Sequence, residues 1–600
     1  MPLITFKTTQ YNKTITIERP QGSSLLEAAR SAGVFIETPC GGKGTCKKCL
    51  VQITENNDQF VLICQSSVPD FPITVILRDQ SENKIDRFEN FDDQALSNYY
   101  KNIVFDESFL KKVKLQIAKP ALLDGLSDAD RFIKAFKKTA ECHTVEIPLN
   151  ILAELPEKIR ENDGKLNLYY YLNNNIAYCV SNEPCVSNEP RVSLETPSAY
   201  GIAVDIGTTT AAIYLIELES KKIIAAHNTY NKQIECGLDV ISRINYAKKY
   251  LSELRKRILD TIIELIDIVC NSVEIKPSQI LCLSLAGNTT MTHLLLGVIP
   301  EYLRLSPYTP AVFQPQIYTA GQLGISVNQN SPALFAPAVG SYVGGDITSG
   351  LLCTKLTDQS NKELILFIDI GTNGEIVLGN NDFIFACACS AGPAFEGAGI
   401  KHGVRAQKGA IEKVSIDANL KVTIQTIGGA PPAGICGSGI ISVIAELFKN
   451  GIIDSAGKFS KKNEEFILCE GISINETDID NFIRAKGAIF SACQTLLDSV
   501  NMSFNDLDKI YVAGGFGRFL DLEDARTIGL LPRLPDNKFI FLGNSSLIGA
   551  YLCLVSEKQR KMLQELSARI TYIDLSSEHK YMDHYTGALF LPHTDKKLFE

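Results

Sequence analysis

Residues 200–210 read YGIAVDIGTTT, and residues 366–376 read LFIDIGTNGEI. In both stretches an apolar strand leads into an aspartate, an Ile-Gly turn and hydroxyl side chains, and a second apolar stretch follows. Backbone N–H groups and hydroxyls of such a hairpin can bind phosphates, while the aspartate can hold a metal ion through water. One copy would be weak evidence, because Asp-Ile-Gly also forms ordinary turns. Two copies between expected strands indicate an internal duplication.

The pair of loops resembles the two phosphate loops of the actin/heat-shock-70/sugar-kinase superfamily. That resemblance implies an α/β fold with mixed sheets, in which two ribonuclease-H-like halves clamp ATP·Mg²⁺. The adenosine motif of the superfamily is matched by IYVAGGFGRF at residues 510–519, where glycines let a helix N-terminus approach the nucleotide. GICGSG at residues 434–439 opens an apolar helix and is expected to form a second wall of the pocket. The residues implied in nucleotide binding are Gly207, Thr208, Thr209, Thr210, Gly371, Thr372, Asn373, Gly437, Ser438, Gly514, Gly515 and Phe516.

Four acidic residues at glycine turns are candidates for the catalytic step. Asp205 and Asp369 end the strands of the duplicated motif, Asp346 follows two glycines in VGGD, and Glu396 lies in SAGPAFEG. Such acids can orient an attacking water or hold Mg²⁺. The alternative is that these turns merely pack close to the sheet and leave the acids solvated at their tips. No Walker A sequence occurs, so a P-loop ATPase is not supported.

Four of the 17 cysteines form a pattern of their own near the N-terminus. PCGGKGTCKKC places Cys40, Cys46 and Cys49 at C-x5-C-x2-C spacing, and Cys64 follows fifteen positions later. Glycines between the first two cysteines let the backbone fold around a cluster and direct N–H groups at its sulfurs, which tunes the reduction potential. The alternative is a structural zinc site, but zinc usually takes two separated C-x2-C knuckles. The spacing therefore favours an iron–sulfur cluster.

This segment resembles the [2Fe–2S] ferredoxins, with the adrenodoxin-like gap of five residues, and the resemblance implies all four cysteines as ligands. The interval between Cys49 and Cys64 is short for such ferredoxins, so a loop after the strand CLVQIT is expected to be trimmed. We expect a ferredoxin-like β-grasp domain at residues 1–80, a flexible linker at 81–116, a small α/β middle domain at 117–196 and the ATPase domain at 197–600.

Composition excludes several classes of protein. The net charge of −9 and the lack of a Lys/Arg-rich block argue against nucleic acid as a partner. No uncharged apolar run is long enough to span a membrane, and residues 1–7 lack the pattern of a signal peptide. A cytoplasmic protein without a disulfide framework is therefore expected.

The order of these segments resembles the reductive activators of corrinoid enzymes over essentially the whole chain. Beyond the motifs already quoted, LAGNTTMTHLLLG and APAVGSYVGGD carry this resemblance. It implies ATP-dependent reduction of an inactive Co(II) corrinoid protein to Co(I), with the electron delivered by a [2Fe–2S] cluster. The clients of the family belong to anaerobic methyl transfer, such as O-demethylases and the corrinoid iron–sulfur protein. An upstream low-potential electron donor is implied as well, and the family also suggests a homodimer.

Other readings of the ATPase fold stay open. A small-molecule kinase would explain the C-terminal half but would leave the cluster without a role. A chaperone-like ATPase would use the cluster only as a structural or sensing element. The activators of 2-hydroxyacyl-CoA dehydratases share the ATPase fold, but they use a [4Fe–4S] cluster that bridges a dimer, and nothing in this sequence supplies that arrangement.

Overall fold

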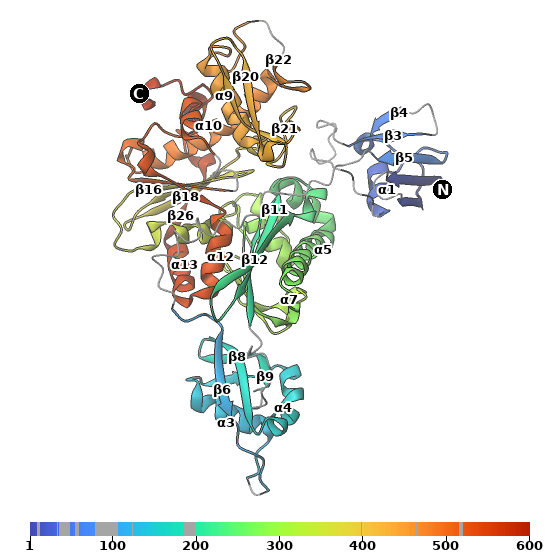
Figure 1. Cartoon of the computed structure of the whole chain (residues 1–600), viewed down its shortest axis with the longest axis vertical. Helices are drawn as coiled ribbons and strands as arrows, with labels where there is room; N and C mark the ends of the chain where they lie inside the picture. Colours follow the sequence, from blue (N-terminus) through green and yellow to red (C-terminus); the bar gives the residue numbers. More distant parts are fainter. Residues whose placement is uncertain are drawn as a thin grey trace.

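The computed structural model is drawn in Figure 1. The structure describes residues 1–8, 13–32, 34, 36, 49–54, 59–77, 106–122, 124–184, 199–397, 399–461, 465–514 and 520–599.

The N-terminal unit is a five-stranded mixed sheet covered by one helix. Its strand order is β2-β1-β5-β3-β4, with β1 and β5 parallel and the other neighbours antiparallel. Helix α1 packs its apolar side on the sheet, where Phe6 and Leu25 are fully buried. The elements are β1 (Leu3–Thr8), β2 (Lys13–Glu18), α1 (Leu25–Ser31), β3 (Leu50–Ile53), β4 (Gln59–Leu62) and β5 (Ile73–Leu77).

The middle unit is a four-stranded sheet with two helices on one side, in the order β6-β8-β9-β7. Its first strand takes up the last residues of the expected linker, because Val113 and Leu115 alternate with exposed residues and face the helices. The unit therefore begins upstream of residue 117, while residues 81–105 lie outside the described residues. The elements are β6 (Lys111–Gln116), α3 (Asp128–Thr139), β7 (Thr144–Glu146), α4 (Leu149–Glu161), β8 (Lys165–Asn173) and β9 (Ile176–Pro184).

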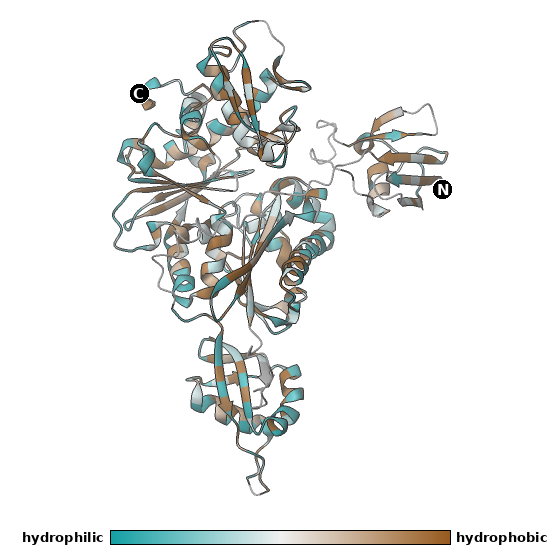
Figure 2. Cartoon of the chain, viewed as in Figure 1, coloured by the Kyte–Doolittle hydropathy of each residue, from teal (hydrophilic) through white to brown (hydrophobic). Residues whose placement is uncertain are grey.

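The first duplicated half is built on the sheet β12-β11-β10-β13-β15-β14. Strands β10 and β11 form an antiparallel hairpin, and β13 lies parallel to β10 on its other side. Brown and teal residues alternate along α5 in Figure 2, as expected for a helix with one buried face. The elements are β10 (Tyr200–Ile206), β11 (Thr210–Glu217), β12 (Lys222–Tyr230), α5 (Val240–Ser272), β13 (Ile280–Gly287), α6 (Thr289–Leu296), β14 (Tyr318–Thr319), α7 (Ala320–Leu323), β15 (Pro332–Phe335) and α8 (Gly345–Gly350).

The second half repeats this plan. In its sheet, β25-β24-β16-β17-β18-β26, the hairpin β16–β17 has β24 parallel to β16. The fold is thus the duplicated α/β architecture expected from the two motifs. The sheet and its helices comprise β16 (Ile365–Ile370), β17 (Gly374–Gly379), β18 (Ile384–Cys389), α9 (Gly437–Lys449), α10 (Glu476–Ser499), β24 (Lys509–Ala513), α11 (Leu522–Thr527), β25 (Phe539–Gly543), β26 (Ile570–Tyr572) and α14 (Tyr581–Ala588). Two smaller sheets add β19 (Ala410–Ile416), β20 (Val422–Thr426), β21 (Gly434–Ile435), β22 (Glu465–Cys469) and β23 (Ile472–Asn475).

Two late helices return to the first half. Helix α12 (Ser545–Val555) packs against β10, β13 and α8, and α13 (Glu557–Arg569) follows it directly. Every residue of α12 is buried. Figure 1 shows these red helices beside the green strands. None of the helices that the structure describes combines the length and apolar character required to cross a membrane.

Candidate functional site

A cavity of about 340 Å³ lies between the two halves, where the duplicated hairpins face each other. Its walls contain every described residue that the sequence suggested for the nucleotide site and the catalytic step. Gly515 and Phe516 lie outside the described residues. The sequence-predicted residues that the structure brings together here are Asp205, Gly207, Thr208, Thr209, Thr210, Asp346, Asp369, Gly371, Thr372, Asn373, Glu396, Gly437, Ser438 and Gly514.

Two turns face each other across this cavity. Phosphate loop 1 (residues 207–209) joins β10 to β11, and phosphate loop 2 (residues 371–373) joins β16 to β17. The side chain of Asn288, which also caps α6, donates to the Thr208 hydroxyl at 2.9 Å. Loop 2 is closed by the Gly371 N–H, which donates to the Asn373 carbonyl at 2.9 Å. Both loops are thus held by their own hairpin ends and nearby caps.

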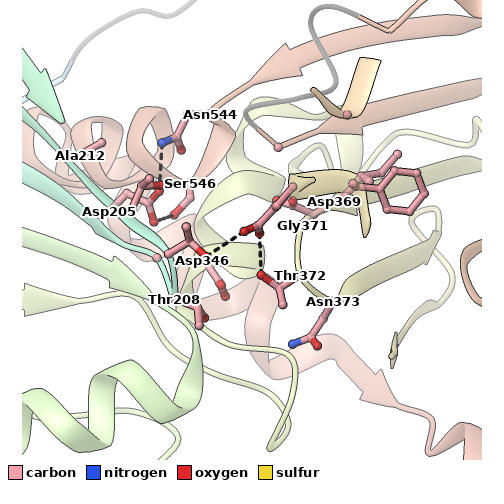
Figure 3. A pocket seen from close by; sticks show the side chains of 18 of the residues that line it. Asp205, Thr208, Ala212, Asp346, Asp369, Gly371, Thr372, Asn373, Asn544 and Ser546 are labelled. Carbon is pink, nitrogen blue, oxygen red and sulfur yellow. Dashed lines mark hydrogen bonds between the residues drawn. The ribbon is translucent and has the colours of Figure 1, made fainter. Parts of the chain in front are cut away.

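Asp205 is fixed by the N-terminus of α12. Its carboxylate accepts hydrogen bonds from the Ser546 hydroxyl at 2.7 Å and from the Asn544 side-chain amide at 2.9 Å, as Figure 3 shows. Burial raises the pKa of Asp205, and these two hydrogen bonds act in the opposite direction. The aspartate is therefore held in a single orientation at the end of β10.

Three further carboxyl groups, those of Asp346, Asp369 and Glu375, line the same cavity as Asp205. Burial, reinforced by the charges of neighbouring aspartates, raises the pKa of Asp346 and that of Asp369 to about 7. Burial and the charges of Asp346 and Asp369 raise the pKa of Glu375 well above its ordinary value. Mutual repulsion of this kind is relieved by a divalent cation, so the donor set fits Mg²⁺.

The carboxylates do not form a protein-only metal cage. Within the part of the chain that the structure describes, no three acidic, histidine or cysteine side chains converge on one point as metal ligands. Magnesium at nucleotide sites usually takes one or two carboxylates, several waters and phosphate oxygens. The arrangement therefore fits an ion that arrives with its nucleotide.

Glu396 connects the two loops. Its carboxylate accepts a hydrogen bond from the Thr209 hydroxyl at 2.9 Å and one from the Thr372 hydroxyl at 2.6 Å. The two threonines belong to different halves, so this single side chain spans the cavity.

Glycines allow close approach at the remaining walls. Gly437 and Ser438 form the first turn of α9, so free N–H groups face the cavity there. Gly514 has a φ of +96°, and a Cβ at this position would lie 2.5 Å from the Ile370 carbonyl. A side chain at residue 514 would therefore push the end of β24 away from loop 2.

Several residues of the site were missed by the sequence reasoning. Glu375 lies within the quoted second motif. A hairpin over that motif places Glu375 opposite Asp369 in the β16–β17 register, and this pairing could have indicated that it belongs to the site. Asn544 and Ser546 carry no motif that links them to Asp205. Arg405 of the second half stacks on the ring of Tyr230 of the first half, 4.6 Å from its centroid, and both line the cavity. Neither has a local sequence signal.

The N-terminal unit brings two of the four predicted cluster ligands together. The sulfurs of Cys49 and Cys64 lie 3.1 Å apart, because the β3–β4 hairpin pairs Leu50 with Leu62. Cys49 is buried and Cys64 is half-buried. Cys40 and Cys46 lie outside the described residues. A converging pair of thiols at the edge of a small core fits one side of an iron–sulfur cluster.

Four family models match successive parts of the chain. They are the "2Fe-2S iron-sulfur cluster binding domain" at residues 8–69, the "RACo linker region" at 101–179, the "RACo middle region" at 200–359 and the "C-terminal domain of RACo the ASKHA domain" at 363–600. The "Corrinoid activation enzyme RamQ" of Eubacterium limosum is 32% identical over 599 residues, which cover 95% of this chain and 96% of that protein. The chain belongs to the family of reductive activators of corrinoid proteins.

Two further relatives agree with this assignment. The "[Co(II) methylated amine-specific corrinoid protein] reductase" of Methanosarcina barkeri is 28% identical over 403 residues, 62% of this chain and 73% of that protein. A solved structure, titled "Reductive activator for corrinoid,iron-sulfur protein", aligns over 100% of both chains with 38% identity and a TM-score of 0.74. The resemblance seen in the sequence is thereby confirmed. As a member of this family the activator carries a [2Fe–2S] cluster and uses ATP·Mg²⁺.

Proposed function

We propose that this activator uses ATP, bound between phosphate loops 1 and 2, to drive a one-electron reduction of Co(II) to Co(I) in a partner corrinoid protein. The observation that carries the proposal is the meeting of both loops and four carboxyl groups in one cavity, on a chain that also brings two cluster cysteines together. The names of the relatives in Eubacterium limosum and Methanosarcina barkeri support a corrinoid protein as the substrate.

The [2Fe–2S] cluster supplies the electron, and Cys40, Cys46, Cys49 and Cys64 are its proposed ligands. Ferredoxin-type clusters of this kind have potentials of about −400 mV. The Co(II)/Co(I) couple of a base-ligated corrinoid lies lower, and each deficit of about 59 mV makes a one-electron step tenfold less favourable. A second source of free energy is therefore needed, which gives the ATP site its role.

The residues of the cavity divide the work on ATP. Asp205 and Asp369, at equivalent ends of β10 and β16, are proposed to hold Mg²⁺ and its waters. Asp346, in the first turn of α8, and Glu396, at the end of a short 3-10 turn after β18, both line the cavity and are proposed to orient the attacking water. The backbone and hydroxyl groups of loops 1 and 2 bind the phosphates, and α9 contributes Gly437 and Ser438.

ATP can favour reduction only through different contacts in its two bound states. A ligand shifts an equilibrium by its differential affinity for the two conformations, and by no more than that. We therefore propose that the activator binds the Co(II) protein through different contacts in its ATP-bound and ADP-bound states. These contacts alter the cobalt environment while the cluster lies close enough to the cobalt to deliver its electron. An upstream low-potential electron donor reduces the cluster again after each transfer. The proposed assembly is a homodimer.

The test is an anaerobic mixture of the reduced, cluster-loaded activator with a Co(II) corrinoid protein, followed by the absorption of Co(I). Co(I) is expected with Mg·ATP and not without it. Asp205→Asn and Cys64→Ser should each abolish the signal, whereas Cys142→Ser should retain it because Cys142 lies in the middle unit, half-buried against its core. ATP turnover and an intact cluster without Co(I) would instead favour a kinase or a chaperone-like ATPase.

A further inference from the structure

Arg243 is a fully buried arginine in the first turn of α5, behind phosphate loop 1. It is absent from the described residues that line the cavity, so it reaches a bound nucleotide only through the loop. Its guanidinium donates to the carbonyl of Thr208, the central residue of that loop. The arginine thus contacts the loop on the side opposite the cavity.

Three consecutive carbonyls of loop 1 accept hydrogen bonds from this rear side. The Asn231 side-chain amide donates to the Gly207 carbonyl at 2.9 Å, Arg243 donates to Thr208, and the Asn231 N–H donates to the Thr209 carbonyl at 2.9 Å. In a planar trans peptide the N–H points opposite to the C=O. The N–H groups of Thr208 and Thr209 therefore point away from Arg243 and Asn231, toward the cavity side of the loop.

Among the described residues Arg243 forms no direct ion pair with a carboxylate, although the charges of Asp239 and Glu396 favour its protonated form. Its other hydrogen bonds go to the Gly237 carbonyl at 2.9 Å, the Gln233 side-chain oxygen at 3.2 Å and the Met291 sulfur. Burial lowers the pKa of Arg243 to about 9, which still leaves the guanidinium protonated at neutral pH. A buried charge whose hydrogen bonds all go to neutral acceptors is costly to keep, and an anion on the far side of the loop reduces that cost.

Loop 2 differs from loop 1 in this respect. Its described hydrogen bonds are the internal Gly371–Asn373 contact, the Thr372 hydroxyl on Glu396 and the Asn373 side chain with Glu375, and none of these comes from a cation. Asp369 precedes loop 2 and Asp205 precedes loop 1, so the two hairpins carry equivalent acids. The buried cation is the feature that distinguishes them.

We propose that Arg243 is a positioning residue for the nucleotide phosphates: it fixes loop 1 and polarises the Thr208–Thr209 peptide, so that the N–H of Thr209 becomes a stronger phosphate donor. A cation on the carbonyl draws electron density through the peptide and strengthens hydrogen bonding at its N–H. This inference rests on the proposed nucleotide site. It assigns a role to a residue that touches neither nucleotide nor metal.

The full-length, cluster-loaded protein allows a matched comparison on one helix. Arg243→Met removes both the positive charge and the hydrogen-bond donors of the guanidinium group. Arg243→Lys keeps the charge but replaces the planar guanidinium with a single ammonium group. Arg255→Met is the control, because Arg255 also donates to two backbone carbonyls, those of Leu295 and Leu323, away from the cavity. The measurements are the affinities for Mg·ATP and for adenosine by titration calorimetry, together with thermal unfolding of each variant.

Arg243→Met is expected to weaken Mg·ATP binding at least tenfold while changing adenosine binding less than twofold, and Arg243→Lys should fall between it and the unaltered protein. Arg255→Met should lose about as much thermal stability as Arg243→Met. Its affinity for Mg·ATP should stay within twofold of that of the unaltered protein. Equal losses for ATP and adenosine, or equal losses in the two methionine variants, would overturn the positioning role. Failure of the unaltered protein to bind Mg·ATP would overturn the proposed function, and this inference with it.

Discussion

Asp205 and Asp106 contact opposite ends of the same buried helix. Asp205, in the nucleotide cavity, accepts hydrogen bonds from residues at the start of α12. Asp106, where the described chain resumes after the N-terminal unit, accepts from the Ser556 hydroxyl and from the Lys558 N–H (2.9 Å) just beyond its end. Eleven helical residues span about 16 Å. The proposed Mg²⁺ ligand and the residue that anchors the start of the middle unit are thus joined by one helix.

Loss of the Asp106 carboxylate should loosen this anchor without affecting the nucleotide site. Asp106→Ala removes an additional cap from α13, a change that typically costs about 1 kcal/mol. We expect faster amide hydrogen exchange in residues 106–110 and in the first turn of α13, with ATP affinity unchanged. The control is Asp358→Ala, which removes a carboxylate from an exposed turn where it accepts hydrogen bonds from Ser360. Unchanged exchange at residues 106–110 would show that the backbone contact of Glu107 with Glu557 is sufficient.

Glu396 offers a test of the contact between the halves. In Glu396→Gln one of the two side-chain oxygens becomes an amide nitrogen, which cannot accept from a threonine hydroxyl. If Glu396 orients the attacking water, kcat for ATP hydrolysis should fall by a factor of about 100 or more. The affinity for ATP should change by less than threefold, as measured by equilibrium titration.

The matched control for Glu396 is Glu363→Gln, which breaks a surface ion pair with Lys355 outside the cavity. It should leave kcat unchanged, because exposed ion pairs contribute little. A Glu396→Gln protein with normal kcat would assign the water-orienting role to Asp346 instead.

The local parts of the site were predictable and the long-range parts were not. Asp205 and Gly207 sit in a strand–turn–strand whose apolar runs and glycine turn are visible in eleven residues, and the second copy repeats them. Ser546 is 341 positions away from Asp205, and its approach depends on α12 packing against a sheet formed much earlier in the chain. Arg243 gave no signal either, because a single arginine in the first turn of an amphipathic helix is normally solvated.

The cluster site separates into a part that sequence specifies and a part that needs structure. The spacing of the cysteines alone predicted Cys49 and Cys64 as cluster ligands. The β3–β4 pairing explains how their sulfurs come close together. Cys64→Ser should abolish the visible absorption and the electron paramagnetic resonance of the reduced cluster. ATP affinity should remain within twofold, because the nucleotide cavity draws on no residue of the N-terminal unit among those described. A Cys142→Ser protein with a full cluster signal completes the comparison, and retention of the cluster in Cys64→Ser would remove this residue from the ligand set.

Lys486 should make stability depend on pH in a defined direction. This lysine of α10 is fully buried, and its amine donates to the Phe590 carbonyl at 2.6 Å and the Pro592 carbonyl at 2.7 Å. Burial lowers the pKa of Lys486 to about 7, far below the ordinary value of 10.5. Between these two values the unfolded chain binds one more proton than the native protein. The free energy of unfolding therefore rises with pH across this window.

Urea unfolding at two pH values measures this contribution. Raising the pH from about 7 to about 9 should stabilise the unaltered protein by about 2 kcal/mol more than Lys486→Met, which has no amine to titrate. Burial also lowers the pKa of the neighbouring His593, so that this group titrates below the window and does not mask the effect. Lys134→Met, at an exposed position of α3, should retain the full pH dependence of the free energy of unfolding. Parallel slopes for the unaltered protein and Lys486→Met would mean that the native fold holds the ammonium form through the two carbonyls.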